Sequence, residues 1–286
     1  MLAKDRSLWR GVDLTNVLIR PLSLVHVQSV LDRGVQAARF ARCAFAEGEL
    51  MFSQKLSLRY LDMSCCDTTA EQLNAILIAN NHSLIKLSIE NCNINQDTFD
   101  LLCKTHTKLQ VLNMALCKVS EPTVNFRHPL SPIMKELNLS WILCDDEIQW
   151  NIHGAIDFLP ENIERLNMSG YRSIHDETLQ DVTLRCGQLV ELDISDCSFL
   201  TSDCLEYIAS DLLALRCLSI SRCHLMINFE PITRMRSLET INCYGLDLEQ
   251  ALCAIPELVI NDSPFSTVAR PTVGNRRSTI WTIRLQ

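Results

Sequence analysis

The sequence predicts an α/β protein assembled from tandem repeats, and three observations support this prediction. A short leucine motif returns about every 25 residues along most of the chain. Segments with helical periodicity separate successive copies of the motif. Cysteine recurs at one fixed offset within the repeat. Self-similarity at a fixed period is the mark of a repeat architecture, so these features predict stacked strand and helix units.

Each copy of the motif reads Leu-x-x-Leu-x-Leu, with other apolar residues replacing some leucines. The intervals between successive second leucines are 26, 25, 25, 29, 26, 26 and 23 residues. This spacing predicts a leucine-rich-repeat solenoid, a curved horseshoe with parallel strands on its concave face and helices on its convex face. The second leucines of the successive copies are Leu61, Leu87, Leu112, Leu137, Leu166, Leu192, Leu218 and, in a weaker form, Ile241.

Helices are expected between the strands, at residues 70–79, 98–103, 178–184 and 203–213, with Asp97, Asp176 and Ser202 as candidate N-caps. Residues 121–132 contain three prolines, which remove helical donors and clash with the preceding turn. We expect an irregular loop there. Before the regular series, residues 12–15 and 38–41 resemble two degenerate strands around a helix at 21–31. The expected organisation is a short N-terminal segment at 1–9 that lies outside the repeats, about ten repeats at 10–260 and a C-terminal tail at 261–286.

Composition excludes several classes of function. The chain has 47% apolar residues and a formal net charge of −8, with no apolar run close to the roughly 18 residues of a membrane span. The acidic balance argues mildly against nucleic acid as a partner, because phosphate binding needs a basic stripe. We therefore expect no membrane and no nucleic-acid partner.

Fourteen cysteines could suggest a disulfide framework, but their placement indicates another use. Five of them stand five residues after the second leucine of their repeat, so they share one structural row. No C-x-x-C pair is present, which argues against zinc and thioredoxin-type sites. We expect buried, inert thiols in a reducing compartment. The five are Cys66, Cys92, Cys117, Cys197 and Cys223.

The sequence gives no positive support for an enzyme, a metal site or a cofactor site. No nucleophile elbow, phosphate-binding glycine loop or H-E-x-x-H motif is present. His153 and His175 lie near Asp157 and Asp176, and we interpret them as solvated polar residues on the convex side.

The concave face is predicted to be polar with an acidic bias, whereas residues 262–286 carry a net charge of +3. This contrast suggests that the tail folds back across the concavity. A sharper signal comes four residues after the second leucine, where Trp141, Gly170, Asp196 and Arg222 share one offset. Tyr171 and Arg172 directly follow Gly170, and we expect them to extend the row at that position. Trp and Arg are enriched at binding hot spots, so this row predicts a protein-binding patch at one edge of the solenoid. The alternative is that Trp141 packs over the neighbouring turn and Asp196 pairs with Arg222.

Several of these segments resemble the S-phase-kinase-associated F-box protein family. The resemblance rests on Leu-Asn-Leu-Ser-Trp at 137–141, Leu-Asn-Met-Ser-Gly-Tyr-Arg at 166–172 and Ala-Arg-Pro-Thr-Val-Gly-Asn at 269–275, with support from 192–196 and 218–223. It implies a non-catalytic substrate receptor of an SCF-type ubiquitin ligase, acting in nucleus and cytoplasm. Such a receptor presents a phosphorylated cyclin-dependent-kinase inhibitor with the help of a cyclin-kinase-subunit adaptor.

By this resemblance, the partner-binding residues would be Trp141, Arg172, Asp196 and Arg222, with Phe265 in the tail. The family places an F-box before the repeats, whereas residues 2–9 resemble only its end. Binding to the SCF scaffold adaptor is therefore expected only if a full F-box precedes this sequence. Two alternatives remain open: a leucine-rich-repeat regulator of a GTPase or a ribonuclease-inhibitor-like protein, and a binding scaffold without a ubiquitin-ligase link.

Overall fold

The computed structural model describes residues 10–16, 21–80, 82–121, 123–144, 149–246 and 257–263. The N-terminal segment at 1–9 and the tail from residue 264, including Phe265, lie outside this part. The chain divides into two compact units. Within the described residues, unit 1 holds those before 135 together with 142–144, 149 and 150, and unit 2 holds 135–141 and 151–263.

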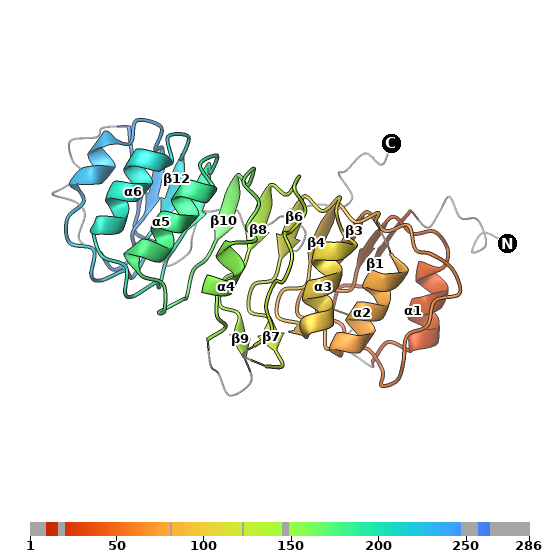
Figure 1. Cartoon of the computed structure of the whole chain (residues 1–286). Coiled ribbons are helices and arrows are strands. Elements are labelled where there is room, and N and C mark those ends of the chain that lie inside the picture. The colour runs from red at the N-terminus through yellow and green to blue at the C-terminus, as the bar shows by residue number, and fades with distance from the viewer. Residues whose placement is uncertain are drawn as a thin grey trace. The chain divides into compact units, whose positions relative to one another are not determined.

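Unit 1 contains a row of parallel strands covered on one face by helices (Figure 1). The second leucine, or its equivalent, pairs with its counterpart in every step from Val12 to Leu112. Further along each repeat, Ile94, Val119 and Cys144 pair in a small second sheet. The elements are β1 (Gly11–Asp13), α1 (Leu24–Leu31), β2 (Ala37–Arg39), β3 (Tyr60–Asp62), α2 (Ala70–Ala79), β4 (Lys86–Ser88), β5 (Asn93–Ile94), α3 (Gln96–Lys104), β6 (Val111–Asn113), β7 (Lys118–Val119) and β9 (Leu143–Cys144).

Unit 2 repeats this plan. Its strands pair in parallel from Leu137 through Leu166, Leu192, Leu218 and Ile241 to Ile260. Helices α5 and α6 pack against each other. The elements are β8 (Glu136–Asn138), α4 (His153–Ile156), β10 (Arg165–Asn167), α5 (Asp176–Arg185), β11 (Glu191–Asp193), α6 (Asp203–Asp211), β12 (Cys217–Ser219), the 3-10 helix η4 (Glu230–Arg234), β13 (Thr240–Asn242) and β14 (Val259–Asn261). The parallel repeats confirm the α/β leucine-rich-repeat solenoid.

The local predictions were mostly confirmed. The degenerate strands appear as β1 and β2, and the described residues of 121–132 contain no helix. Two N-cap assignments were wrong: Asn95 caps α3 through a capping box with Thr98, which puts Asp97 in the first turn. His175 occupies the N-cap position of α5, and the helix begins at Asp176. Ser202 is at the N-cap position of α6, although its hydroxyl accepts hydrogen bonds from Ile227 and Asn228 instead.

One prediction about the strand face was also wrong. The residue after each second leucine was expected on an open polar surface, but from Asp62 to Asn242 these side chains are buried. In five of them a carboxylate or amide oxygen turns back and accepts a hydrogen bond from the backbone two residues later, as Asn138 does from Ser140 at 3.0 Å and Asp193 from Ser195 at 2.9 Å. Such Asx turns satisfy a backbone N–H group where these five strands end. In the part of the chain that the structure describes, no helix has the length and apolar character needed to cross a bilayer.

Candidate protein-binding site

Unit 2 brings the residues at the shared offset into one line, which we call the rim row: Trp141, Gly170, Asp196, Arg222 and Gly245. Each lies four residues after the central residue of its strand, and these central residues pair in register. Neighbouring strands lie about 4.8 Å apart, so the rim row presents its side chains at that regular interval.

The backbone of the rim row adopts a left-handed conformation throughout, with φ of 54° at Trp141, 61° at Asp196 and 60° at Arg222. Gly170 and Gly245 have φ of 92° and 79°. In this conformation the amide N–H groups of the first four residues point to the next repeat: Trp141 donates to the Ser169 carbonyl at 3.1 Å and Asp196 to the Ser221 carbonyl at 2.9 Å. A sharp turn of this kind ends the strand and holds its side chain at the edge of the sheet.

Trp141 packs over the neighbouring repeat. A Cβ atom placed on Gly170 would lie 2.3 Å from Cδ2 and 2.5 Å from Cε2 of the Trp141 ring, so the indole rests on the Gly170 backbone. Trp141 as a whole residue is nevertheless 39% exposed. Trp141 therefore presents an aromatic surface whose orientation is already fixed. Such a side chain loses little conformational entropy when a partner covers it.

Asp196 and Arg222 form a bidentate pair, in which Nε and Nη2 of Arg222 donate to the two carboxylate oxygens of Asp196. These hydrogen bonds raise the pKa of Arg222, so the guanidinium stays charged. The guanidinium carbon also lies 5.7 Å from the centre of the Tyr244 ring, within cation–π range. Arg222 is thus fixed by Asp196 and Tyr244, and its Nη1 group is not used by Asp196.

The fourth predicted residue, Arg172, is exposed two residues beyond Gly170. Tyr171, which was expected to extend the rim row, is instead fully buried. Its hydroxyl donates to the Leu139 carbonyl. The reason is its position five residues after the second leucine, where five of the other repeats place a buried cysteine.

The structure therefore aligns Trp141, Asp196 and Arg222 in one row and leaves Arg172 exposed near it, while Phe265 lies outside the described residues. Both geometric features of the alternative interpretation are also present, because Trp141 packs on Gly170 and Asp196 pairs with Arg222. Sequence reasoning missed Tyr244 as the ring beside Arg222. The available signal was its place three residues after Ile241, where most other repeats have serine.

The cysteine row is buried as predicted. The Sγ atoms of Cys92, Cys117, Cys197 and Cys223 each lie 3.1 to 3.4 Å from a carbonyl oxygen of the preceding repeat, to which the thiol can donate. Burial raises the pKa of Cys92 to about 12, which keeps this thiol protonated. Cys65 and Cys217 are only partly buried.

The two histidines singled out in the sequence have structural partners. His153 lies 3.0 Å from the Ser173 carbonyl through Nε2, and His175 stacks on Phe199 with ring centres 5.2 Å apart. Across the described ranges, no group of three or more His, Cys, Asp or Glu side chains could hold a metal ion. The rim row itself presents the exposed aromatic surface of Trp141 and the charge pair of Asp196 and Arg222.

Solved structures that are similar to this chain share little sequence identity with it. A chain of the Rad7 and Elc1 complex in yeast is 12% identical, with 89% of this chain and 68% of that chain covered and a TM-score of 0.55. The leucine-rich-repeat protein LegL7 from Legionella pneumophila is 16% identical, with 88% and 82% covered and a TM-score of 0.44. An internalin from Listeria monocytogenes is 12% identical, with 90% and 75% covered and a TM-score of 0.48.

The family assignment comes from the sequence of the repeats themselves. Residues 25–286 match the family described as the SKP2 LRR domain, which is most of the chain. The chain belongs to the SKP2 LRR domain family.

Proposed function

We propose that this chain is the substrate-recognition part of an SCF-type ubiquitin ligase and binds phosphorylated cell-cycle proteins such as cyclin-dependent-kinase inhibitors. The membership of residues 25–286 in the SKP2 LRR domain family supports this assignment. The observation that carries it is the rim row, in which Trp141, Asp196 and Arg222 share one edge of unit 2. The proposed role is non-catalytic and is carried out in the nucleus and cytoplasm.

In this proposal the rim row binds the cyclin-kinase-subunit adaptor, and adaptor and receptor together hold the phosphorylated protein. Trp141 contributes apolar surface that is desolvated on binding. Arg222 contributes directed hydrogen bonds, because its Asp196 pair leaves the Nη1 donors available. Arg172 extends the charged surface, and Phe265 would add an apolar contact from the tail. Binding to the SCF scaffold adaptor requires an F-box and is proposed only for a chain that carries one upstream.

The test is a binding titration of the purified chain with a cyclin-kinase-subunit adaptor and a phosphothreonine peptide from a kinase inhibitor. We expect a ternary complex, and Arg222→Ala should weaken it by about 2 kcal/mol or more, which is roughly 30-fold.

Arg216→Ala is the matched control. Arg216 makes a similar bidentate pair with Glu239 at 2.8 Å, but both side chains are well exposed and outside the rim row. This variant should bind within about twofold of the parent, since exposed pairs contribute little. Absence of binding by the parent chain, or equal losses in the two variants, would remove the proposal.

A further inference from the structure

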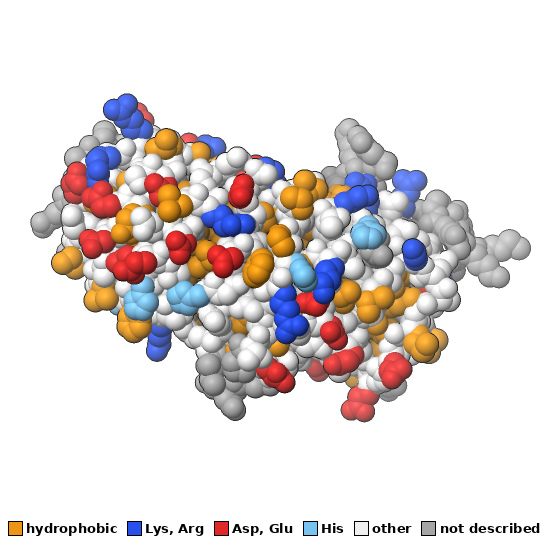
Figure 2. All heavy atoms as spheres, viewed as in Figure 1, with side chains coloured by type: hydrophobic (Ala, Val, Ile, Leu, Met, Phe, Trp, Pro, Cys, Tyr) orange, Lys and Arg blue, Asp and Glu red, His pale blue; other side chains and the backbone are white. Residues whose placement is uncertain are grey.

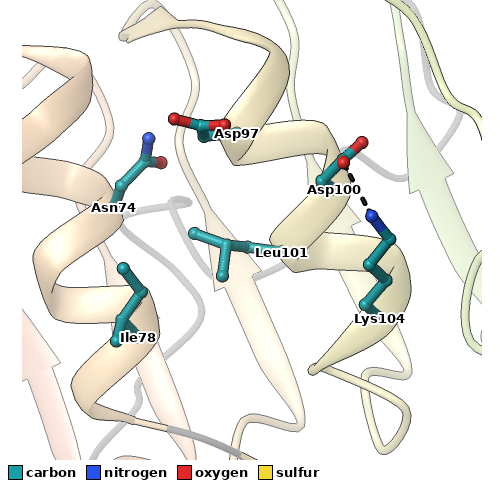
Figure 3. A pocket seen from close by; sticks show the side chains of 6 residues that line it. All are labelled: Asn74, Ile78, Asp97, Asp100, Leu101 and Lys104. Carbon is teal, nitrogen blue, oxygen red and sulfur yellow. Dashed lines mark hydrogen bonds and ion pairs between the residues drawn. The ribbon is translucent and has the colours of Figure 1, made fainter.

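Two hollows flank helix α2 on the helical face of unit 1. The first, of about 290 Å³, lies between α2 and α3 (Figure 3). The second, of about 520 Å³, lies between α2 and the loop at residues 50–55. Ile78 borders both. The first is lined by Asn74, Ile78, Asp97, Asp100, Leu101 and Lys104.

The second hollow exists because the repeat between β2 and β3 has no helix on this face. A loop takes its place and is tied to α2, where Nε2 of Gln72 donates to the Ala46 and Gly48 carbonyls at 2.9 Å. The residues of α2 that face this hollow include Ala75 and Ala79. Because these side chains are small, another backbone can approach α2 closely.

Large apolar side chains remain exposed around these hollows. Ile78 is 61% exposed and Met51, in the loop, is 73% exposed. Figure 2 shows hydrophobic side chains gathered over α2, with acidic side chains below them in the view. A contiguous apolar surface with a polar border is typical of a protein-binding site.

The two carboxylates that line the first hollow differ in their partners. Asp100 accepts from Nζ of Lys104 at 2.8 Å and from Nε2 of Gln96 at 2.9 Å, and the Lys104 contact is the main reason why its pKa is lowered. No described cation pairs with Asp97. Asn74 is held by Asn95 and Thr98. The hollow therefore has an unneutralised carboxylate.

The apolar part of the same hollow comes from the facing helices. Leu101 points from α3 toward α2, where Ile78 lies opposite, and Asp97 and Asn74 face each other at the polar end (Figure 3). An apolar floor that leads to one carboxylate matches a side chain with an aliphatic stem and a cationic head. Lysine and arginine have this form, because they bury their methylene groups while the charge remains near water.

We propose that this face of unit 1 binds a peptide segment of a further partner protein, with a lysine or arginine in the first hollow and a large apolar side chain in the second. The methylene stem lies on Ile78 and Leu101, and the cationic group pairs with Asp97. A helix is about 10 Å wide and an extended chain advances about 3.3 Å per residue, so the two anchors lie three or four residues apart. This surface is separate from the rim row and goes beyond the function proposed above.

Selection from a displayed library of 12-residue peptides on the whole chain provides the ligand for the test. Selected peptides are synthesised with a fluorescent label, and their affinities are measured by anisotropy. We expect a basic and a large apolar residue three or four positions apart. Asp97→Asn should weaken binding five- to tenfold, as should replacement of the basic residue by norleucine. In the norleucine peptide, Asp97→Asn should have no further effect.

Glu177→Gln is the matched control, since Glu177 is the second residue of α5 as Asp97 is of α3, and it is exposed in unit 2. This variant should bind the peptides like the parent. Ile78→Glu, at an exposed position, should abolish binding while thermal unfolding stays unchanged. The proposal is overturned if no peptide is selected, if selected peptides bind Asp97→Asn and Ile78→Glu as well as the parent, or if Glu177→Gln weakens them equally.

Discussion

The indole ring of Trp141 rests on the backbone of Gly170, the residue at the same position in the next repeat. Two features of Gly170 make this contact possible. Its φ of 92° is a conformation that other residues rarely adopt, and it has no Cβ atom to displace the ring. The contact fixes the orientation of the indole, while Trp141 as a residue is still 39% exposed.

The first prediction concerns this contact. Gly170→Ala should lower the free energy of unfolding by about 3 kcal/mol, because it adds backbone strain to a clash with the ring. It should also weaken adaptor binding, since the indole must move. In a Trp141→Ala background the clash disappears, and the same substitution should cost only about 1 kcal/mol. Urea unfolding of the four proteins in this cycle measures the difference. Equal costs in both backgrounds would show that the ring does not rest on Gly170.

The second prediction extends to the whole series of left-handed turns. The described part of unit 1 has the same turn at Leu116, where φ is 59° and the side chain is exposed. Leucine pays about 1 kcal/mol or more for this conformation, whereas asparagine tolerates it. Leu116→Asn should therefore raise the unfolding free energy by about 0.5 kcal/mol, measured by urea unfolding.

Leu184→Asn is the control for this prediction. Leu184 is also exposed, but it lies in α5, where asparagine is a poorer helix former than leucine. This substitution should lower the unfolding free energy by about 0.5 kcal/mol. If both substitutions change stability in the same direction, the left-handed conformation of Leu116 is not the cause.

The repeat architecture could be predicted from the sequence because its signal is periodic. In each repeat, the second leucine of the motif or its equivalent forms the buried centre of a strand. It pairs with its counterpart in the neighbouring strand, as Leu166 does with Leu192. A shared offset from that leucine implies a shared position, so the buried cysteine row and the alignment of Trp141, Asp196 and Arg222 followed from counting alone.

The direction in which an individual side chain points could not be predicted in the same way. Asp62 and Asn138 look like surface residues in an alternating strand, yet both are buried, and each accepts a hydrogen bond from the backbone N–H two residues later. Tyr171 follows the offset rule toward the interior, although it was expected to extend the rim row. The stack of Arg222 on Tyr244 depends on side-chain conformations in two repeats, which no spacing specifies.

The third prediction concerns the thiols. The native protein should react with a maleimide or with a disulfide reagent at Cys65 and Cys217, which are partly buried, much faster than at Cys117 or Cys197, which are fully buried. Burial also raises the pKa of Cys103 to about 12, so little reactive thiolate forms there at pH 8. Peptide mapping by mass spectrometry reads each cysteine separately. In 8 M urea all 14 cysteines should react at similar rates, and fast native labelling of Cys117 would contradict the buried row.

The fourth prediction is a pH dependence that arises from His106. This ring is fully buried, and burial lowers its pKa to about 4, with a smaller effect from His82 and only the backbone of Leu77 in opposition. In the unfolded chain the ring takes up a proton near pH 6.5. As the pH falls below 6.5, the unfolded state gains a proton that the folded state rejects, so stability is lost until about pH 4.

Between pH 7 and pH 5 this ring should reduce the free energy of unfolding by about 2 kcal/mol. Urea unfolding at both pH values measures the loss, which also contains contributions from carboxyl groups. His106→Leu removes only the part due to His106, so the variant should lose about 2 kcal/mol less than the parent over the same interval. His26→Leu, at an exposed position in α1, should lose as much as the parent. If His106→Leu follows the parent curve, the buried ring does not exclude the proton.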